Sequence, residues 1–467
     1  MPVFPLYGVL RVNLNSSFSR ILRPAALMAA LFVAPSLQAQ SLEDAMVLTY
    51  STNPTLQAAR AGLRAVDESI SQALSGWRPT IQGQANLAYQ RSETNVSSFD
   101  TTHPHSYNLS VTQPIYSGGQ TVAQTSQADN LIMAQRQSLI TSEQQVLLNA
   151  VTSYMGVVLA YSVLDLAISN EERLSRQLEA TEDRFRVGEV TRTDVSQARA
   201  RFASAQAERV QAEGDLIAQM ATFEEVIGTR PANLTRPGAL IGLPQSLDEA
   251  LAIALDNNPA ILQARASEQA AQDGVDVQIA DLLPDLNLVG TYTRKEDISG
   301  VISHQNNLSL VAQLTIPFYQ AGFESSQIRE SYQSAAQSRM LVTESLRTVE
   351  ADVISAWQGL ATARAEIAAF TEEVNANTVA LEGTEREAQV GERTVLDILD
   401  AEQELFQSQI NLAVAERDEV VASYTLQATL GRLTAEYLRL PVDLYDVNAY
   451  YEEARDAWWG YGGLTDD

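Results

Sequence analysis

The segment SLEDAMVLTYSTNPTLQAAR, residues 41–60, returns later in the chain as SLDEALAIALDNNPAILQAR, residues 246–265. The two segments share Ser-Leu at the start, Asn-Pro in the middle and Arg at the end, all at one constant offset. Further matches follow in the same order, namely Pro79 with Pro284, Pro114-Ile-Tyr116 with Pro317-Phe-Tyr319, and Val187-Gly-Glu189 with Val390-Gly-Glu392. Matches in one order indicate an internal repeat. The sequence therefore predicts two copies of one structural unit, residues 40–245 and 246–440.

Each copy opens with two helix-start signals. In the first copy Ser41 and Asp44 have the spacing of a capping box. Asn53 is suited to cap a second helix, which Pro54 would begin, because Pro is tolerated at the first helical position. We expect this helix to run to about Gly76. The second copy repeats the signals with Ser246, Glu249, Asn258 and Pro259, and its helix is expected to end near Asp281.

Two stretches of alternating apolar and polar residues follow, which is the pattern of β-strands. They lie at residues 81–90 and 107–112 in the first copy, and at residues 286–292 and 308–316 in the second. Each copy thus predicts one β-hairpin, and its polar face of Gln, Asn, Ser and Thr suits a water-filled lumen. A sandwich with one solvated face is the alternative. The loops between the strands are expected to be polar and to hold His103, His105 and His304.

A very long helix is predicted after each hairpin. Residues 120–186 contain no proline and would span about 100 Å at 1.5 Å per residue. After a turn at Gly188, residues 193–227 would span about 52 Å, and residues 54–76 about 34 Å. The two shorter helices, stacked end to end, nearly equal the long one. Each copy, the second with its turn at Gly391, would therefore build two helical staves of similar length.

The first 39 residues have the pattern of a secretory signal peptide. Three arginines precede a short apolar run, residues 25–33, and Ala39 provides a small residue before the expected cleavage site. A core helix at the N-terminus is the alternative. Beyond Gln40 no run of about 18 apolar residues occurs, so we expect no membrane-spanning helix.

Composition excludes several function classes. The chain has no cysteine, which excludes disulfides and thiolate sites, and its formal net charge of −27 would repel nucleic acid. No catalytic triad, HExxH motif or phosphate-binding loop is present, so we predict no enzymatic activity and no cofactor. Three histidines in loops do not define a coordination geometry, so we predict no metal site.

The strand number implies an oligomer. Four strands per chain cannot close a membrane barrel, for which about eight is the minimum, and open sheet edges do not occur in lipid. Two chains would give eight strands, and three would give twelve with room for a channel. The sequence therefore predicts an α+β membrane protein. The alternative is a secreted coiled-coil structural or adhesive protein of the cell envelope.

The chain resembles the TolC family of outer-membrane efflux proteins. The resemblance rests on Asn53-Pro54 with Asn258-Pro259, Pro114-Ile-Tyr-Ser-Gly-Gly119, Val187-Gly188 with Thr193-Asp194-Val195, and Val390-Gly-Glu-Arg-Thr-Val-Leu-Asp397-Ile-Leu-Asp400-Ala401. It implies a homotrimer with a twelve-stranded β-barrel in outer-membrane lipid of a Gram-negative bacterium and a helical tunnel in the periplasm. The implied partners are a periplasmic adaptor and an inner-membrane ABC or proton-driven transporter. The absence of Cys resembles the non-lipidated branch, which serves type I secretion and drug efflux.

The resemblance also implies where the functional residues lie. The turns at Gly188 and Gly391 would form the periplasmic tip that contacts the adaptor. Asp397 and Asp400 share a helix face, and in a trimer they would form two rings of carboxylates at the entrance. The alternative is that both are acids that favour a helix N-terminus.

A latch at the entrance is also implied, in which Arg393 bonds Thr193 or Asp194 on a neighbouring helix. The family often has an aromatic residue three positions before the turn glycine; Phe185 keeps it, but the second copy has Ala388. The tail, residues 441–467, is expected on the periplasmic side. Its pairs Tyr450-Tyr451 and Trp458-Trp459 are expected to pack on the outside of the tunnel rather than to anchor in the membrane interface.

Overall fold

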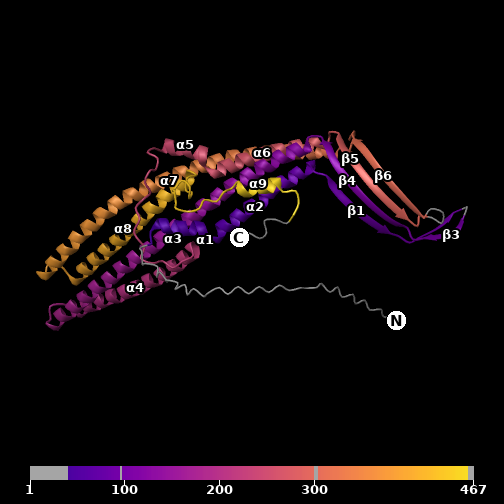
Figure 1. Cartoon of the computed structure of the whole chain (residues 1–467). Helices are drawn as coiled ribbons and strands as arrows, with labels where there is room; N and C mark the ends of the chain where they lie inside the picture. The colour runs from indigo at the N-terminus through magenta and orange to yellow at the C-terminus, as the bar shows by residue number, and fades with distance from the viewer. Residues whose placement is uncertain (1–39, 95–96, 299–302, 461–467) are drawn as a thin grey trace, which may run out of the picture. The chain divides into compact units, whose positions relative to one another are not determined.

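The computed structural model describes residues 40–94, 97–298 and 303–460, and Figure 1 shows a small sheet at one end of a long helical body. The predicted signal peptide lies outside the described residues. The first copy consists of α1 Leu42–Thr52, α2 Pro54–Leu74, the short turn η1 Ser75–Trp77, β1 Thr80–Leu87, β4 His105–Ser117, α3 Gln120–Arg186 and α4 Arg192–Ile227. The second consists of α5 Leu247–Asn257, α6 Pro259–Ala280, β5 Asp285–Glu296, β6 His304–Thr315, α7 Phe323–Gln389 and α8 Val395–Thr429, before α9 Ala449–Asp456 in the tail.

The four strands form one antiparallel sheet in the order β1-β4-β5-β6. Its register places the apolar residues in rows, one of which runs Ile81, Val111, Gly290 and Leu310. The next row is polar and runs Gln82, Ser110, Thr291 and Ser309. The apolar row is exposed on the single chain, with Leu310 73% exposed. This alternation confirms the predicted hairpins, and it leaves an apolar face that is uncovered within the chain.

The expectation of simple polar loops between the strands was wrong in the first copy. The chain there forms a second small sheet, in which β2 Gln90–Thr94 pairs with β3 Ser97–Thr102. The polar sequence of this segment lacks the alternation on which the strand prediction relied. His103 lies just after β3, but His105 begins β4 and His304 begins β6, so two of the three histidines belong to strands.

The Asn-Pro pairs mark the places where two short helices meet end to end. The Asn53 side chain accepts the Thr55 amide at 2.9 Å and donates to the Val226 carbonyl at 3.0 Å, so it holds the start of α2 against the end of α4. Asn258 holds the start of α6 against the end of α8 in the same way. The two predicted end-to-end stacks are therefore present, each joined by one amide side chain.

The capping box at the start of the first copy is complete, whereas its counterpart is half formed. Ser41 and Asp44 exchange both hydrogen bonds. Ser246 accepts from the Glu249 amide, but the Glu249 carboxylate accepts from the Gln245 amide instead of from Ser246. A longer Glu side chain reaches the residue before the cap, which changes the second bond but not the helix start.

The main core lies along the middle of α3, against α1 and α4. Leu147, Val151 and Tyr154 are fully buried there, and the Tyr154 hydroxyl lies 2.8 Å from both the Gln40 and the Thr235 carbonyl oxygens. Among the described helices, α3 alone contains a stretch long and apolar enough to cross a membrane. Of that stretch, 39% is buried within the chain, in part against α1 and α4.

Candidate functional site

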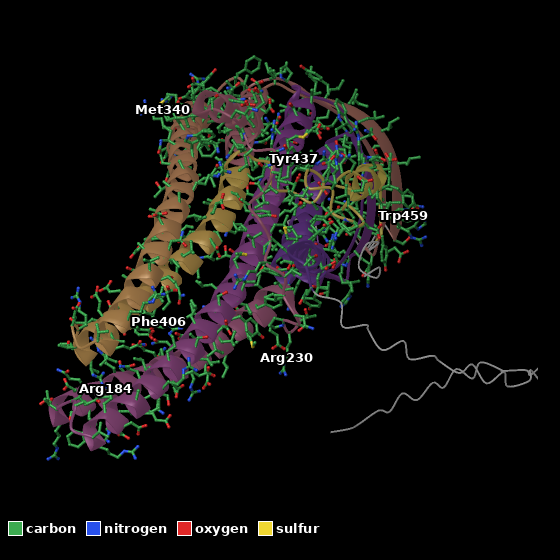
Figure 2. All side chains as sticks on the ribbon, turned by 90° about the vertical axis from the view of Figure 1, so that its left-hand side faces the viewer. Arg184, Arg230, Met340, Phe406, Tyr437 and Trp459 are labelled. Atoms are coloured by element: carbon green, nitrogen blue, oxygen red, sulfur yellow. The ribbon has the colours of Figure 1, made fainter. Side chains whose placement is uncertain are left out.

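The two helical hairpins, α3–α4 and α7–α8, end at the same extremity of the molecule, opposite the sheet (Figure 1). Figure 2 labels Arg184 at this extremity, and Phe406 of α8 somewhat farther up. These ends contain both predicted tip turns and all the predicted site residues. We refer to this region as the tip.

The two tip turns have the same backbone geometry. Gly188 and Gly391 have φ angles of +81° and +82°, a left-handed conformation in which a side chain would be strained. In each turn the next residue, Glu189 or Glu392, donates its amide to a carbonyl five residues earlier, as in a Schellman motif. The predicted interruptions of the long helices are thus two copies of one glycine-terminated turn.

Two of the predicted site carboxylates are bound in capping boxes. Asp194 accepts hydrogen bonds from the Thr191 amide at 2.7 Å and from its hydroxyl at 2.8 Å. Asp397 does the same with Thr394, at 2.8 Å for both bonds. The bond from the Thr394 amide is the main reason why the pKa of Asp397 lies below its usual value. The Thr-x-x-Asp spacing in the sequence is the signal for this role, as Ser-x-x-Asp is at the start of the first copy.

Arg393 does not reach either predicted latch partner within the chain. Its Nε lies 2.8 Å from Oε2 of Glu387, across the turn, and this carboxylate is the main cause that raises the Arg393 pKa. Thr193 is exposed, and the Asp194 carboxylate is bound by Thr191. Within one chain the structure therefore brings Arg393 to the second copy's own turn and not to the first copy.

Asp400 joins the second structural unit to the first, a contact that the sequence did not predict. Its Oδ1 lies 2.8 Å from the Arg201 guanidinium, so α8 is linked to α4. Both side chains are partly exposed to solvent, and such pairs contribute only about 0–1 kcal/mol to stability. The contact matters more for geometry, because it positions one of the predicted ring carboxylates.

A second ion pair between the copies is buried. Arg173 of α3 donates to Glu402 of α8 at 2.7 Å, and the Glu402 side chain is only 6% exposed. Burial raises the pKa of Glu402 despite the neighbouring Arg173. Beside it an apolar cluster, which includes Leu174, Ala198 and Leu399, packs α3, α4 and α8 together. The tip of each chain is thus one packed unit. No sequence pattern indicated which helices would pair.

Within the part of the chain that the structure describes, the histidines and carboxylates form no metal centre. Among the described residues no group of three His, Asp or Glu side chains is placed to hold a metal ion. The His103 backbone amide donates to Asp297 at 2.6 Å, and the His103 ring contacts Tyr89 edge-on at 5.3 Å. His103 therefore makes local contacts with Asp297, which follows β5, and with Tyr89, which follows β1.

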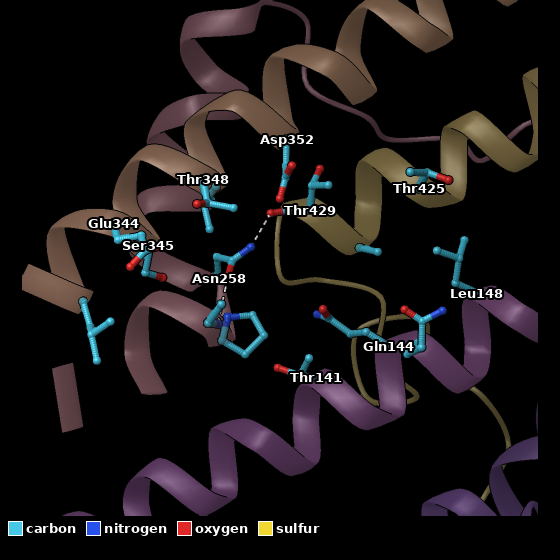
Figure 3. A pocket seen from close by; sticks show the side chains of 16 residues that line it. Thr141, Gln144, Leu148, Asn258, Glu344, Ser345, Thr348, Asp352, Thr425 and Thr429 are labelled. Carbon is cyan, nitrogen blue, oxygen red and sulfur yellow. Dashed lines mark hydrogen bonds between the residues drawn. The ribbon is translucent and has the colours of Figure 1, made fainter. Parts of the chain in front are cut away.

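A groove of about 500 Å³ opens at the second Asn-Pro joint, far from the tip. Figure 3 shows Asn258 reaching the Thr429 carbonyl within it, between α3, α6, α7 and α8. Hydroxyl, amide and carboxylate residues line it, among them Gln144, Thr348 and Asp352. The groove therefore lies where the stack of α8 on α6 meets α3 and α7.

Comparisons with known proteins agree with this architecture. A family model described as outer membrane efflux protein matches the chain twice, over residues 47–229 and 250–432. Outer membrane efflux protein BepC of Brucella suis is 36% identical over 422 residues, which make up 90% of this chain and 92% of BepC. Outer membrane protein TolC of Escherichia coli strain K12 is 26% identical over 420 residues, covering 86% of this chain and 84% of TolC.

A solved structure extends the comparison to the fold. The Campylobacter jejuni CmeC outer membrane channel is similar with a TM-score of 0.74 at 15% identity, and the match covers 89% of each chain. The fold is that of the TolC-like channels, in which the four-stranded sheets of three chains close a twelve-stranded barrel above the helices. The alternative of a secreted coiled-coil or adhesive protein has no support, because the matched proteins are outer-membrane channels and the sheet has an uncovered apolar face.

Proposed function

The chain belongs to the outer membrane efflux protein family, and we propose that it works as a homotrimer with a periplasmic adaptor and an inner-membrane ABC or proton-driven transporter. The protein is an outer-membrane export channel with its helical part in the periplasm, and it serves type I secretion, efflux of small toxic molecules, or both. The signal peptide of residues 1–39 and the two units of residues 40–245 and 246–440 are part of this proposal, as is a periplasmic tail of residues 441–467.

The exposed tip turns support the adaptor contact. Val187 and Val390 precede the two turn glycines, and they are 73% and 74% exposed. Two apolar side chains at the outermost turns, repeated in three chains, give an adaptor six equivalent points of contact. Gly188 and Gly391 would hold these side chains outward, since a left-handed glycine lets each helix reverse within a few residues.

The packed tip is the observation that carries the entrance assignment. The pairs Arg201–Asp400 and Arg173–Glu402 fix the start of α8 against the first copy. In the trimer three such starts surround one axis, so Asp397 and Asp400 would form two rings of three carboxylates. Like charges in a narrow, partly desolvated opening attract cations. A bound multivalent cation would bridge carboxylates of different chains and obstruct the opening.

The proposed latch then has to act between chains. Arg393 bonds Glu387 in its own turn, so a bond to Thr193 or Asp194 would involve the neighbouring chain's tip. Replacing Arg393 with Ser removes the guanidinium without changing the carboxylate rings. The variant is therefore expected to raise single-channel conductance while block by a trivalent cation remains.

Planar-bilayer conductance of the purified trimer, with and without a trivalent cation, tests the ring assignment. Asp397→Ala/Asp400→Ala should abolish the block and weaken the preference for cations. The fold should persist, because the first-turn acid Asp397 is worth about 0.3–1 kcal/mol and the partly exposed Arg201–Asp400 pair about 0–1 kcal/mol. Asp44→Ala is the matched control, because it breaks a complete capping box of the same kind at the start of α1, outside the tip. Unchanged block in the double variant, or an equal loss in the control, would show that these carboxylates act only at their helix starts.

A further inference from the structure

The C-terminal tail lies along α2 and then turns toward the sheet. The Tyr450 hydroxyl bonds Glu68 of α2 at 2.7 Å, and the Tyr451 hydroxyl bonds Asp129 of α3 at 2.8 Å. Ala454 is buried against the same two helices. Both tyrosines are therefore fixed on the helical body, and α9 directs the residues that follow it toward the end of α2, where the sheet begins.

Arg78 fixes the end of the tail at the base of the sheet. This residue lies two positions before β1, and its guanidinium donates to the Ala457 carbonyl at 2.6 Å. The Arg78 guanidinium also lies 5.0 Å from the Trp458 ring centre, a cation–π contact. Ser71 of α2 donates to the same Ala457 carbonyl at 3.2 Å. Three contacts thus place Trp458 next to the point where the chain enters the barrel.

The two tryptophans after α9 are uncovered. Trp458 is 69% exposed and Trp459 is 96% exposed, although Trp is ordinarily among the more buried residues. Figure 2 shows Trp459 at the edge of the molecule on the side of the strands. Other large aromatic residues are exposed next to the same end of the sheet, namely Trp77 before β1 and Phe318 and Tyr319 after β6. The tail pair therefore extends a group of exposed aromatic residues at the base of the barrel.

The chemistry of these residues fits the boundary between lipid and water. Indole rings concentrate at headgroup level, and membrane barrels carry aromatic girdles at both interfaces. The apolar row that begins with Ile81 starts one residue inside β1, so the girdle level falls at the residues just before it. We propose that Trp458 and Trp459 insert into the headgroup region of the periplasmic leaflet and anchor the tail to the membrane, outside the barrel itself. This reverses the sequence-based expectation for this pair, while Tyr450 and Tyr451 remain on the helices.

The charges around the pair favour a zwitterionic phospholipid surface. Glu452, Glu453 and Asp456 lie on or at the end of α9, and they outnumber Arg455 there. Arg78 is engaged by the tail backbone and by Trp458. The local excess of negative charge would oppose anionic headgroups, so the attraction must come from the indole rings rather than from charge.

Quenching by brominated lipid tests the proposal on the full-length trimer in phosphatidylcholine nanodiscs. The chain has four tryptophans, and Trp77→Phe/Trp357→Phe leaves only the tail pair. Fluorescence should fall by about half with bromine near the headgroup, and less with bromine near the chain ends, because an interfacial indole lies at headgroup depth. A variant that keeps only Trp357, on α7 in the helical body, should show no quenching.

Two further variants separate the anchor from its neighbours. Arg78→Gln releases the tail and should reduce the quenching, whereas Arg455→Gln removes an equal charge from α9 and should leave it unchanged. Absence of lipid quenching with free access to aqueous acrylamide would place the pair in water and overturn the proposal. Absence of lipid quenching with protection from acrylamide would also overturn it, since a neighbouring chain would then cover the pair. Quenching that requires anionic lipid would overturn the zwitterionic assignment.

Discussion

The two long helices α3 and α7 are copies of one element, and both contain 67 residues, yet they are buried to very different extents. α3 packs against α1, α2, α4, α6 and α8, and it buries a nearly continuous series of side chains in its middle. α7 packs against α5, α6 and α8, and its buried residues are widely spaced. Large apolar residues remain exposed on both helices, for example Met133 on α3 and Met340 and Val379 on α7. The same repeat therefore supplies both the centre of the chain and an edge for the next chain in the trimer to cover.

The largest expected difference between the copies is at Tyr154 and its counterpart, Trp357. Tyr154 is fully buried on α3, and its hydroxyl, which has one proton to donate, lies 2.8 Å from two backbone carbonyl oxygens, whereas Trp357 on α7 is only partly buried. Tyr154→Ala should cost about 3–5 kcal/mol in the free energy of unfolding, as large aromatic truncations do. Trp357→Ala should cost clearly less. Denaturant titration of helical circular dichroism, with monomer and trimer separated, measures both, and equal losses in the monomer would contradict the comparison.

The two Asn-Pro joints should also respond unequally. Gly228 and Gly431 end α4 and α8 with positive φ angles, so an alanine at either costs about 1–2 kcal/mol. A Cβ at Gly431 would in addition lie 2.3 Å from the Asn257 carbonyl oxygen, whereas Gly228 has ordinary space around it. Gly431→Ala should therefore lower the melting temperature more than Gly228→Ala. The reverse order would show that α8 and α6 can move apart at the second joint without loss of stability.

A smaller difference concerns pH. Asp67 of α2 is fully buried, and neither of its carboxylate oxygens has a hydrogen-bond partner among the described residues. Burial raises its pKa to about 6, which Arg136 opposes and Glu68 reinforces. The corresponding residue in the second copy is Gln272. Because the folded state binds the Asp67 proton more tightly, this contribution to stability is complete below pH 3.8 and is lost as the pH rises through about 6.

Asp67→Asn makes the first copy resemble the second and should remove this pH dependence. At neutral pH the variant should be more stable than the native chain by about 1–3 kcal/mol, because an amide has no charge to desolvate and a shift of one pKa unit corresponds to about 1.4 kcal/mol. Melting temperatures between pH 5 and 7.5 measure the effect. Gln272→Asn serves as the control and should leave the native pH dependence in place; a persistent slope in Asp67→Asn would assign it to another group.

The sequence predicted those features that local residues decide. Pro54, Pro259 and the two turn glycines bound the helices, and alternation placed the strands, because these signals act within a few residues. The packing differences could be predicted only in part, because the long apolar stretch that α3 has and α7 lacks indicates deeper burial but does not show which helices cover it. The pairs Arg201–Asp400 and Arg173–Glu402 join residues about 200 positions apart and depend on which helices meet. At Asp397 the Thr-x-x-Asp capping signal was present in the sequence, but the family resemblance led to the prediction of a carboxylate ring there.

The Asn-Pro joints have an electrical consequence. At each one the carbonyl end of a helix, which carries partial negative charge, faces the amide end of the next, which carries partial positive charge. The asparagine side chain, an acceptor on one side and a donor on the other, continues the hydrogen-bond polarity across the gap. α4 and α2 do not follow one another in the sequence, and neither do α8 and α6. Each pair nevertheless forms one dipole aligned from the tip to the barrel. Its partial charges are left at the two far ends, and the positive end lies at the tip beside Asp194 and Asp397.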